Sequence, residues 1–375
     1  MKKTKIISLV VVLALLAALF AGCQASSEES STAPASASVQ AGASASGATA
    51  SGAETSPDVS AASGGGKHAI VFKNTGNPYG EKEMEGFENA IKETGGEAIL
   101  RAPDQPTAEG QIQIIEELIA QGVNSITVVA NDIDALQPVL TKAMNAGVAV
   151  LAADSSVNSA SRKLFINQAG VNLIGQALVD AAYDMCGGSG QFAILSATSQ
   201  ASNQNAWIES MQTILKSDSK YSGLELVKVA YGDDLRDKSV SETEALLQTY
   251  PDLKCIVAPT TVGIAAAGKV LTDKGLGGKV ALTGLGLPSE MAEYIENGVC
   301  EYMFLWNPID LGYLSGYAAS AMTSGQITGI VGDKFSAGDL GDYEVTAAAD
   351  GGTEVLLGPP FKFDSTNIGE WKNIY

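Results

Sequence analysis

The stretch "SITVVANDIDALQPVLTKAMNAGVAVLAAD", from Ser125 to Asp154, decides the fold. An apolar run, "SITVVA", precedes a segment with helical periodicity, "IDALQPVLTKAMNAG", and a second apolar run, "VAVLAAD", closes it. Runs that are apolar at every position are typical of strands buried on both faces of a parallel sheet. The order strand, helix, strand therefore predicts a right-handed βαβ unit.

The same alternation extends in both directions from this stretch. "AIVFK" (69–73) and "EAIL" precede it, each followed by a helical segment, and a second series begins at "LFINQ" and passes through "QFAILSA", "LELVKVAY", "CIVAP", "KVALTGLG" and "EYMFLWN". Two such series predict two doubly wound α/β lobes with parallel sheets and a ligand cleft between them. We expect an N-terminal lobe of residues 67–155 plus about 287–305, a C-terminal lobe of residues 156–286 plus about 306–345, and a tail, 346–375, packed on the lobes. Crossing segments are expected near 154–158, 284–287 and 305–308.

The first 66 residues have the features of an export signal and a tether, and we expect no folded domain there. "MKKTKIISLVVVLALLAALFAGC" has a basic start, a short apolar core and small residues before Cys23, which is typical of a secretory signal peptide over residues 1–22. "LFAGC" resembles a bacterial lipobox, so Cys23 is the expected lipidation site; the alternative is a plain signal peptide with an incidental Cys. Residues 23–66, rich in Ala, Ser and Gly, predict a disordered tether, because they contain almost no large apolar residue to bury.

Composition excludes several classes of function. The formal charge is −19, from 23 Lys and Arg against 42 Asp and Glu, and no basic cluster follows Lys5, which argues against nucleic acid and against electrostatic docking on lipid. The only His is His68, and the Cys residues after Cys23 are widely spaced, so neither a catalytic triad nor a metal site is expected. "GIAAAGKV" (263–270) fails as a phosphate-binding loop because Val270 lacks the required hydroxyl, so we expect no cofactor.

Polar and aromatic residues follow the C-terminal ends of the predicted strands. Open α/β sheets bind ligands at that edge, so we expect these residues to face a shared cleft. The candidates are Lys73, Asn131, Asp154, Asn203, Gln204, Pro259, Thr261, Trp306 and Asn307. For each residue alone an ordinary role is open, because Asn, Asp and Thr after strands also cap helices, Lys73 could be a solvated charge, and Trp306 could be core packing. We expect Trp207 to pack its helix against the sheet rather than to contact ligand.

The chemistry of these candidates suits a small neutral polyhydroxylated molecule. Amides both donate and accept hydrogen bonds, and a carboxylate accepts from two adjacent hydroxyls. A phosphorylated ligand would call for more Arg, and the chain has only Arg101, Arg162 and Arg236.

After the tether, the chain resembles the type I periplasmic binding proteins of ABC importers, and within them the rhamnose-binding and autoinducer-2-binding branch. The resemblance is carried by "PTAEGQIQIIEELIAQGVNSITVVANDIDAL", "NQNAWI", "YGDDLRDKS", "YPDLKCIVAPTTVGIAAA", "TGLGLPSEM", "LWNPIDLGY" and "GPPFKFDSTNI". It implies ligand contacts at Lys73, Asp154, Asn203 with Gln204, and Pro259 with Thr261, and an aromatic contact at Tyr79. Two positions depart from the autoinducer-2 pattern, since Asn203 stands where that branch has a carboxylate and Thr261 where it has Ala.

The sequence thus predicts a binding protein, not an enzyme. We expect a monomeric, extracytoplasmic lipoprotein that is lipid-anchored to the cell membrane, on the outer face of the plasma membrane or in the periplasm. It is expected to close on rhamnose, autoinducer-2 or a similar ligand and to deliver it to an ABC permease. A sensory lipoprotein that signals to a receptor is the alternative. A glycosidase is disfavoured, because no second carboxylate stands beside Asp154 as an evident acid/base partner.

Overall fold

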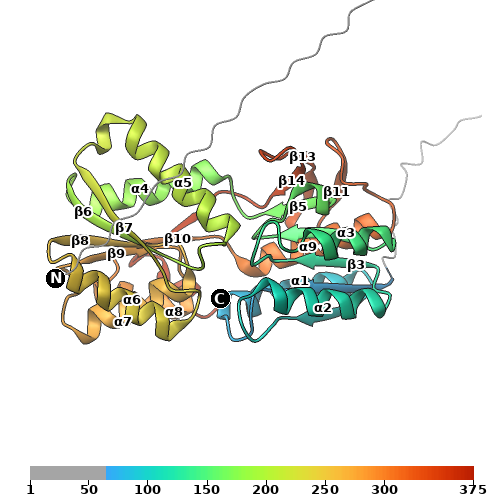
Figure 1. Cartoon of the computed structure of the whole chain (residues 1–375), viewed down its shortest axis with the longest axis horizontal. Coiled ribbons are helices and arrows are strands. Elements are labelled where there is room, and N and C mark those ends of the chain that lie inside the picture. Colours follow the sequence, from blue (N-terminus) through green and yellow to red (C-terminus); the bar gives the residue numbers. More distant parts are fainter. Residues whose placement is uncertain (1–64) are drawn as a thin grey trace, which may run out of the picture. The chain divides into compact units, whose positions relative to one another are not determined.

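The structure, a computed structural model, describes residues 65–375. The predicted signal peptide (1–22), the lipidation site Cys23 and the predicted tether as far as residue 64 lie outside the described residues. The described residues form two lobes, each built on its own sheet (Figure 1).

The first lobe contains a seven-stranded sheet in the order β13-β14-β5-β4-β3-β1-β2. Every neighbouring pair is parallel except the edge pair β13 and β14. The bounds are β1 (Lys67–Val71), β2 (Glu97–Arg101), β3 (Ser125–Val128), β4 (Ala149–Ala153), β5 (Leu164–Asn167), β13 (Thr346–Ala347) and β14 (Thr353–Leu356). The βαβ unit predicted from Ser125–Asp154 is confirmed, with α3 (Gln137–Asn145) between β3 and β4.

Alternate residues of the central strands enter two different cores, which explains why a strand such as β4 is apolar at every position. Ile70 and Leu151 face the core that includes α1 (Pro78–Glu93) and α9 (Pro308–Thr323). Val71 and Val150 face the other core, which contains residues of α2 (Ala108–Ala120) and α3. Helices thus cover both faces of the sheet, as expected for a doubly wound fold.

The second lobe contains a parallel four-stranded sheet in the order β7-β6-β8-β9. Its strands are β6 (Gly190–Ser196), β7 (Leu224–Tyr231), β8 (Leu253–Ala258) and β9 (Ala281–Gly284), and β10 (Tyr302–Leu305) is bridged to β9. Helices α4 (Val171–Met185) and α5 (Ser202–Ser217) pack together on one side, while α6 (Arg236–Thr249), α7 (Thr261–Asp273) and α8 (Pro288–Glu296) lie on the other (Figure 1).

The last fifty residues are divided between the lobes. After the antiparallel hairpin β11 (Lys334–Ser336) and β12 (Asp342–Glu344), β13 and β14 extend the first sheet. Strand β15 (Phe361–Asp364) then pairs antiparallel with β10, and α10 (Ile368–Trp371) packs on α8. Short 3₁₀ turns span Ser159–Ser161, Ser219–Tyr221 and Gly338–Leu340.

The lobe assignment from sequence needs three corrections. Residues 156–167 were expected in the C-terminal lobe, but β5 pairs with β4 and β14 in the first sheet. Residues 306–345 were expected in the C-terminal lobe, but α9 packs against α1 and the first sheet; residues 287–305 were expected in the N-terminal lobe, but α8 and β10 join the second. The chain consequently passes between the lobes at 167–171, 305–308 and 356–361, so only the crossing expected at 305–308 agrees. Apolar periodicity identifies a helix but not the sheet that it covers, because either sheet could bury it.

Helices α1 and α9 approach each other through glycines. A Cβ on Gly86 would lie 1.9 Å from the carbonyl oxygen of Ile309, and a Cβ on Gly312 would lie 1.8 Å from the carbonyl oxygen of Glu83. Real Cβ atoms do not approach that closely, so this contact requires glycine on both helices. It seats α9 on the first lobe and fixes α1, whose N-terminus points at the cleft.

Candidate functional site

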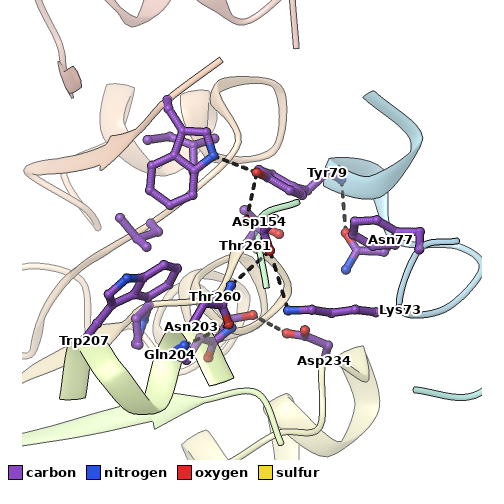
Figure 2. A pocket seen from close by; sticks show the side chains of 15 residues that line it. Lys73, Asn77, Tyr79, Asp154, Asn203, Gln204, Trp207, Asp234, Thr260 and Thr261 are labelled. Atoms are coloured by element: carbon purple, nitrogen blue, oxygen red, sulfur yellow. Dashed lines mark hydrogen bonds and ion pairs between the residues drawn. The ribbon is translucent and has the colours of Figure 1, made fainter. Parts of the chain in front are cut away.

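A pocket lies between the lobes, at the C-terminal ends of both sets of strands (Figure 2). Its volume is about 40 Å³. The first lobe contributes Phe72, Lys73, Asn77, Tyr79 and Asp154, and Trp306 comes from a segment that connects the lobes. The second lobe contributes Asn203, Gln204, Trp207, Asp234, Pro259, Thr260, Thr261, Leu285 and Leu305. A water molecule needs roughly 10–15 Å³ by the same kind of measure, so the pocket in this conformation has room for only a few waters, and a larger ligand requires the walls to separate.

The backbone delivers the charged residues directly from strand ends. Lys73 follows β1 by two residues, Asp154 follows β4 at once, and Asp234 follows β7 by three. Asp154 and Asp234 both have positive φ, 54° and 52°, a conformation that Asp adopts more readily than most side chains. The turn at each strand end thereby holds a carboxylate at the pocket.

Asp154 is the centre of the polar contacts. Its Oδ1 accepts a hydrogen bond from the Tyr79 hydroxyl at 3.2 Å. Its Oδ2 accepts from Asn203 Nδ2 at 3.0 Å, and the Lys73 ammonium lies 3.7 Å from the same oxygen (Figure 2). Ser155 Oγ also donates to Oδ2, at 3.2 Å. Because Asp154 belongs to the first lobe and Asn203 to the second, this carboxylate joins the lobes.

The second lobe holds its own polar residues by local contacts. Gln204 Oε1 accepts from Ser196 Oγ at 2.7 Å and from the Ala197 amide at 2.8 Å, so its side chain is fixed to the end of β6. Thr260 caps α7 and donates its hydroxyl to the Asp234 carboxylate. These residues are thus held in place by the protein itself.

Aromatic rings form the remaining wall. Trp306 Nε1 donates to the Tyr79 hydroxyl at 2.6 Å, and that hydroxyl donates in turn to Asp154. The ring centroids of Trp207 and Trp306 are 5.8 Å apart, with the planes inclined at 63°. Trp207, which we expected only to pack its helix, therefore also lines the pocket.

Burial shapes the charge of the site. Desolvation raises the pKa of the Tyr79 hydroxyl well above its usual value, and the Asp154 charge adds to this, so Tyr79 is a neutral donor. Desolvation also raises the pKa of Asp234, while the Lys73 ammonium opposes that rise. One ammonium thus faces two carboxylates across the pocket, an arrangement that disfavours an anionic ligand.

The structure brings together eight of the ten residues predicted from sequence, and two lie outside the pocket lining. The eight are Lys73, Tyr79, Asp154, Asn203, Gln204, Pro259, Thr261 and Trp306. Asn131 instead donates from Nδ2 to the Lys73 carbonyl at 2.8 Å, bracing the loop that carries Lys73. Asn307 caps α9 by accepting from the Ile309 amide at 3.0 Å, which is the ordinary role left open for it.

Several lining residues were not predicted. Asp234 follows a predicted strand, in "YGDDL", and the strand-end rule applied to it would have found it. Asn77 lines the pocket and also caps α1, accepting from the amides of Tyr79 and Gly80. Phe72, Leu285 and Leu305 are apolar and carry no distinguishing signal in the sequence.

No group of three or more His, Cys, Asp or Glu able to hold a metal ion occurs within residues 65–375. Over the same range, none of the helices has both the length and the apolar character needed to cross a membrane.

A cleft between two α/β lobes, lined with carboxylates, amides, an ammonium and aromatic rings, defines a binding protein for a small polar solute. The chain belongs to the periplasmic binding protein family, whose profile, described as a periplasmic binding protein domain, matches residues 68–327. Proteins of this family are extracytoplasmic and bind solutes rather than transform them.

Individual relatives narrow the class. An ABC transporter solute-binding protein from Clostridium phytofermentas, solved with bound L-rhamnose, is 53% identical; the match covers 83% of this chain and 99% of that one, with a TM-score of 0.82. LsrB from Clostridium saccharobutylicum, in complex with AI-2, is 23% identical over 81% of this chain and 99% of its own, with a TM-score of 0.77, a likeness of fold alone. The D-ribose/D-allose-binding protein of Pseudomonas aeruginosa is 24% identical over 228 residues, 58% of this chain and 69% of the relative. The chain is thus a member of the sugar-binding proteins of ABC transporters.

Proposed function

We propose that this protein is the substrate-binding lipoprotein of an ABC importer and that it binds L-rhamnose, or a small neutral sugar much like it, between its lobes. The observation that carries the proposal is the Asp154 carboxylate, which is buried at the lobe junction among hydrogen-bond donors from both lobes. The rhamnose-bound relative at 53% identity, matched over 99% of its length, supports the choice of sugar.

The pocket offers the groups that a neutral sugar needs. The Asp154 carboxylate can accept from two adjacent hydroxyls, and the Asn203 amide and the Lys73 ammonium can donate to ring or hydroxyl oxygens. Trp207 and Trp306 present apolar faces to the C–H groups of the sugar. A phosphorylated sugar would bring negative charge toward Asp154 and Asp234, which favours the neutral one.

Ligand binding is proposed to act by shifting an equilibrium between open and closed lobes. The segments 167–171, 305–308 and 356–361 connect the lobes and are the proposed hinges. Two direct contacts hold the lobes together near the pocket: Asn203 with Asp154, and the Ser202 hydroxyl with the Ser156 carbonyl at 3.0 Å. A ligand that contacts Asp154 and α5 at once would take over the first contact and stabilise the closed arrangement.

Isothermal titration calorimetry with L-rhamnose tests the binding proposal. The substitution Asp154→Asn keeps the shape of the side chain but removes the charge that strengthens its hydrogen bonds, each worth about 1.5–3 kcal/mol when charged. We expect a loss of roughly 10- to 100-fold in affinity, since 1.4 kcal/mol corresponds to about tenfold. Asp132→Asn is the matched control, because Asp132 also follows a first-lobe strand but only caps the turn at Asp134 and Ala135. If wild-type protein binds AI-2 and not L-rhamnose, the assignment of the sugar is wrong.

Transport and membrane attachment need separate experiments. Uptake of labelled L-rhamnose should be lost when the gene is deleted and restored by the wild-type copy; uptake that persists without the protein would favour a sensory role. Metabolic labelling with a fatty acid should mark the wild-type protein but not Cys23→Ala, and equal labelling of both would exclude Cys23 as the anchor. Recovery of unchanged sugar after prolonged incubation is expected of a non-enzyme, and any product would contradict it.

A further inference from the structure

A carboxyl group that does not line the pocket is buried on α1, one helical turn after Tyr79, which does line it. Tyr79, Glu83 and Phe87 follow one another at four-residue spacing on α1, so they share the buried face of that helix. Tyr79 reaches the pocket and Phe87 enters the core. Glu83 lies between them and has no exposed surface (0 %).

The Glu83 carboxyl group has no hydrogen-bond partner for either oxygen among residues 65–375. The backbone of α1 at Glu83 lies against α9, since a Cβ on Gly312 would come within 1.8 Å of the Glu83 backbone carbonyl oxygen. The charged groups that act on Glu83 come from the strand ends of the first lobe: Asp154 after β4, which raises its pKa, and Lys73 after β1, which lowers it. Desolvation is the largest influence, and the pKa of Glu83 stands well above its usual range.

The protonation state of Glu83 affects which carboxylates attract the Lys73 ammonium. A buried carboxylate without hydrogen bonds is strongly disfavoured, so burial favours the protonated, neutral form of Glu83. With Glu83 neutral, Asp154 is the carboxylate beside Lys73 in the first lobe, at 3.7 Å. Ionised Glu83 would be a second carboxylate competing for the same ammonium.

We propose that Glu83 is a positioning residue of the sugar site: its neutral carboxyl group leaves the Lys73 ammonium to Asp154 and the ligand, and its ionisation draws the ammonium away and weakens sugar binding. The inference rests on the proposed function, because sugar affinity is its readout. Asp234, on the far side of the pocket, also interacts with Lys73 and belongs to the same charge balance.

The substitution Glu83→Gln tests this directly, because glutamine has the shape of the neutral acid and cannot ionise. Buried Glu residues titrate at about pH 8–9 in documented cases, so calorimetry with L-rhamnose should run from about pH 6 to about pH 9. Wild-type affinity should fall as pH rises across this range, because the sugar binds better when Glu83 is protonated and so raises the pKa of Glu83. The total fall should be roughly tenfold for each pH unit by which bound sugar raises that pKa. Glu83→Gln should bind as wild type does at the low end and keep its affinity at the high end.

Glu85→Gln is the matched control, since Glu85 lies on the same helix but is exposed and pairs with Lys82. It should reproduce the wild-type pH profile. The proposal is overturned if wild type and Glu83→Gln have the same pH profile, or if Glu83→Gln binds much more weakly than wild type at about pH 6.

Two measurements without sugar separate this inference from the proposed function. The infrared carbonyl band of a protonated carboxylic acid should be present in wild type at neutral pH and absent from Glu83→Gln. Thermal unfolding should show Glu83→Gln gaining stability relative to wild type as pH rises above the unfolded-state pKa of Glu, about 4.3. If no sugar binds at any pH, the proposed function fails, whereas absence of the infrared band from wild type refutes a neutral Glu83.

Discussion

The substitution Asn203→Asp places a second carboxylate against Asp154 and tests whether the two lobes meet as described. Asn203 Nδ2 lies 3.0 Å from Asp154 Oδ2, so a carboxylate oxygen in its place would replace a hydrogen bond by a repulsion. Two unit charges at that distance repel by about 5.5 kcal/mol at an effective dielectric constant of about 20. The N-terminus of α5 returns roughly 0.3–1 kcal/mol, because it favours negative charge in the first turn. The pair therefore cannot remain doubly ionised without a large cost.

Proton uptake relieves this repulsion, and it makes the stability of the variant depend on pH. The shared proton has a raised folded-state pKa, so its stabilising contribution is complete below the unfolded-state pKa of Asp, about 3.9, and is lost as pH rises through the folded value. We expect the variant to approach wild-type stability near about pH 4 and to be about 2–4 kcal/mol less stable at about pH 8. Urea unfolding of both proteins at several pH values measures the difference.

Asn205→Asp provides the control for this experiment. Asn205 lies on the same first turn of α5, but its side chain donates to the Ser199 carbonyl at 2.8 Å and does not line the pocket. This contact is exposed, so an ionised carboxylate at position 205 can turn into solvent, and the variant should depend on pH much less than Asn203→Asp does. If Asn203→Asp loses the same stability at every pH, or if Asn205→Asp behaves identically, the contact between Asn203 and Asp154 does not exist in solution.

Two further predictions concern packing and spectroscopy. Gly312→Ala should lower the free energy of unfolding by roughly 1–3 kcal/mol, because its Cβ would overlap the Glu83 backbone carbonyl. Gly369→Ala is the control and should change the free energy of unfolding little, because no atom lies within 4 Å of the added Cβ. Equal stabilities of the two variants in urea unfolding would contradict the close contact between α1 and α9. Binding of sugar should change the tryptophan fluorescence, and this change should be smaller in Trp207→Phe and in Trp306→Phe. It should persist in Trp371→Phe, because the Trp371 ring packs with Phe361 and Phe363 outside the pocket. A fluorescence change that is lost only in Trp371→Phe would place the ligand elsewhere.

The sheets were predictable from sequence because strands that are buried on both faces appear as continuous apolar runs. Strand β4 (Ala149–Ala153) is apolar at every position, and the structure shows alternate residues of β1 and β4 entering separate cores. The assignment of α9 was not predictable in the same way. Its partner α1 lies some 220 residues earlier in the chain, and the fit depends on Gly86 and Gly312 facing each other, a pairing that periodicity does not encode.

The pocket was predictable to the extent that strand ends converge on it. Lys73, Asp154 and Pro259 follow strands, and the rule that ligands bind at that edge was enough to place them together. Asn131 and Asn307 also follow strands, but the side-chain amide of each forms a hydrogen bond to the backbone instead of facing the pocket. The sequence pattern does not distinguish these two roles. Glu83 could not have been singled out, because a Glu within a helix is ordinarily exposed.

The contacts around Asp154 bear on where affinity and specificity arise. In this conformation Oδ2 of Asp154 already accepts from Asn203 and Ser155, so a sugar hydroxyl that binds at this oxygen replaces a protein donor. An exchange of one hydrogen bond for another contributes only about 1 kcal/mol net. Trp207 and Trp306 line the same pocket, so contact of their rings with the C–H groups of a sugar is the second contribution to affinity. Selectivity, in contrast, comes from the polar contacts. A ligand that leaves Asp154 or Asn203 without a hydrogen-bond partner incurs the full cost of desolvating that group, so sugars whose hydroxyls do not point toward these residues bind more weakly.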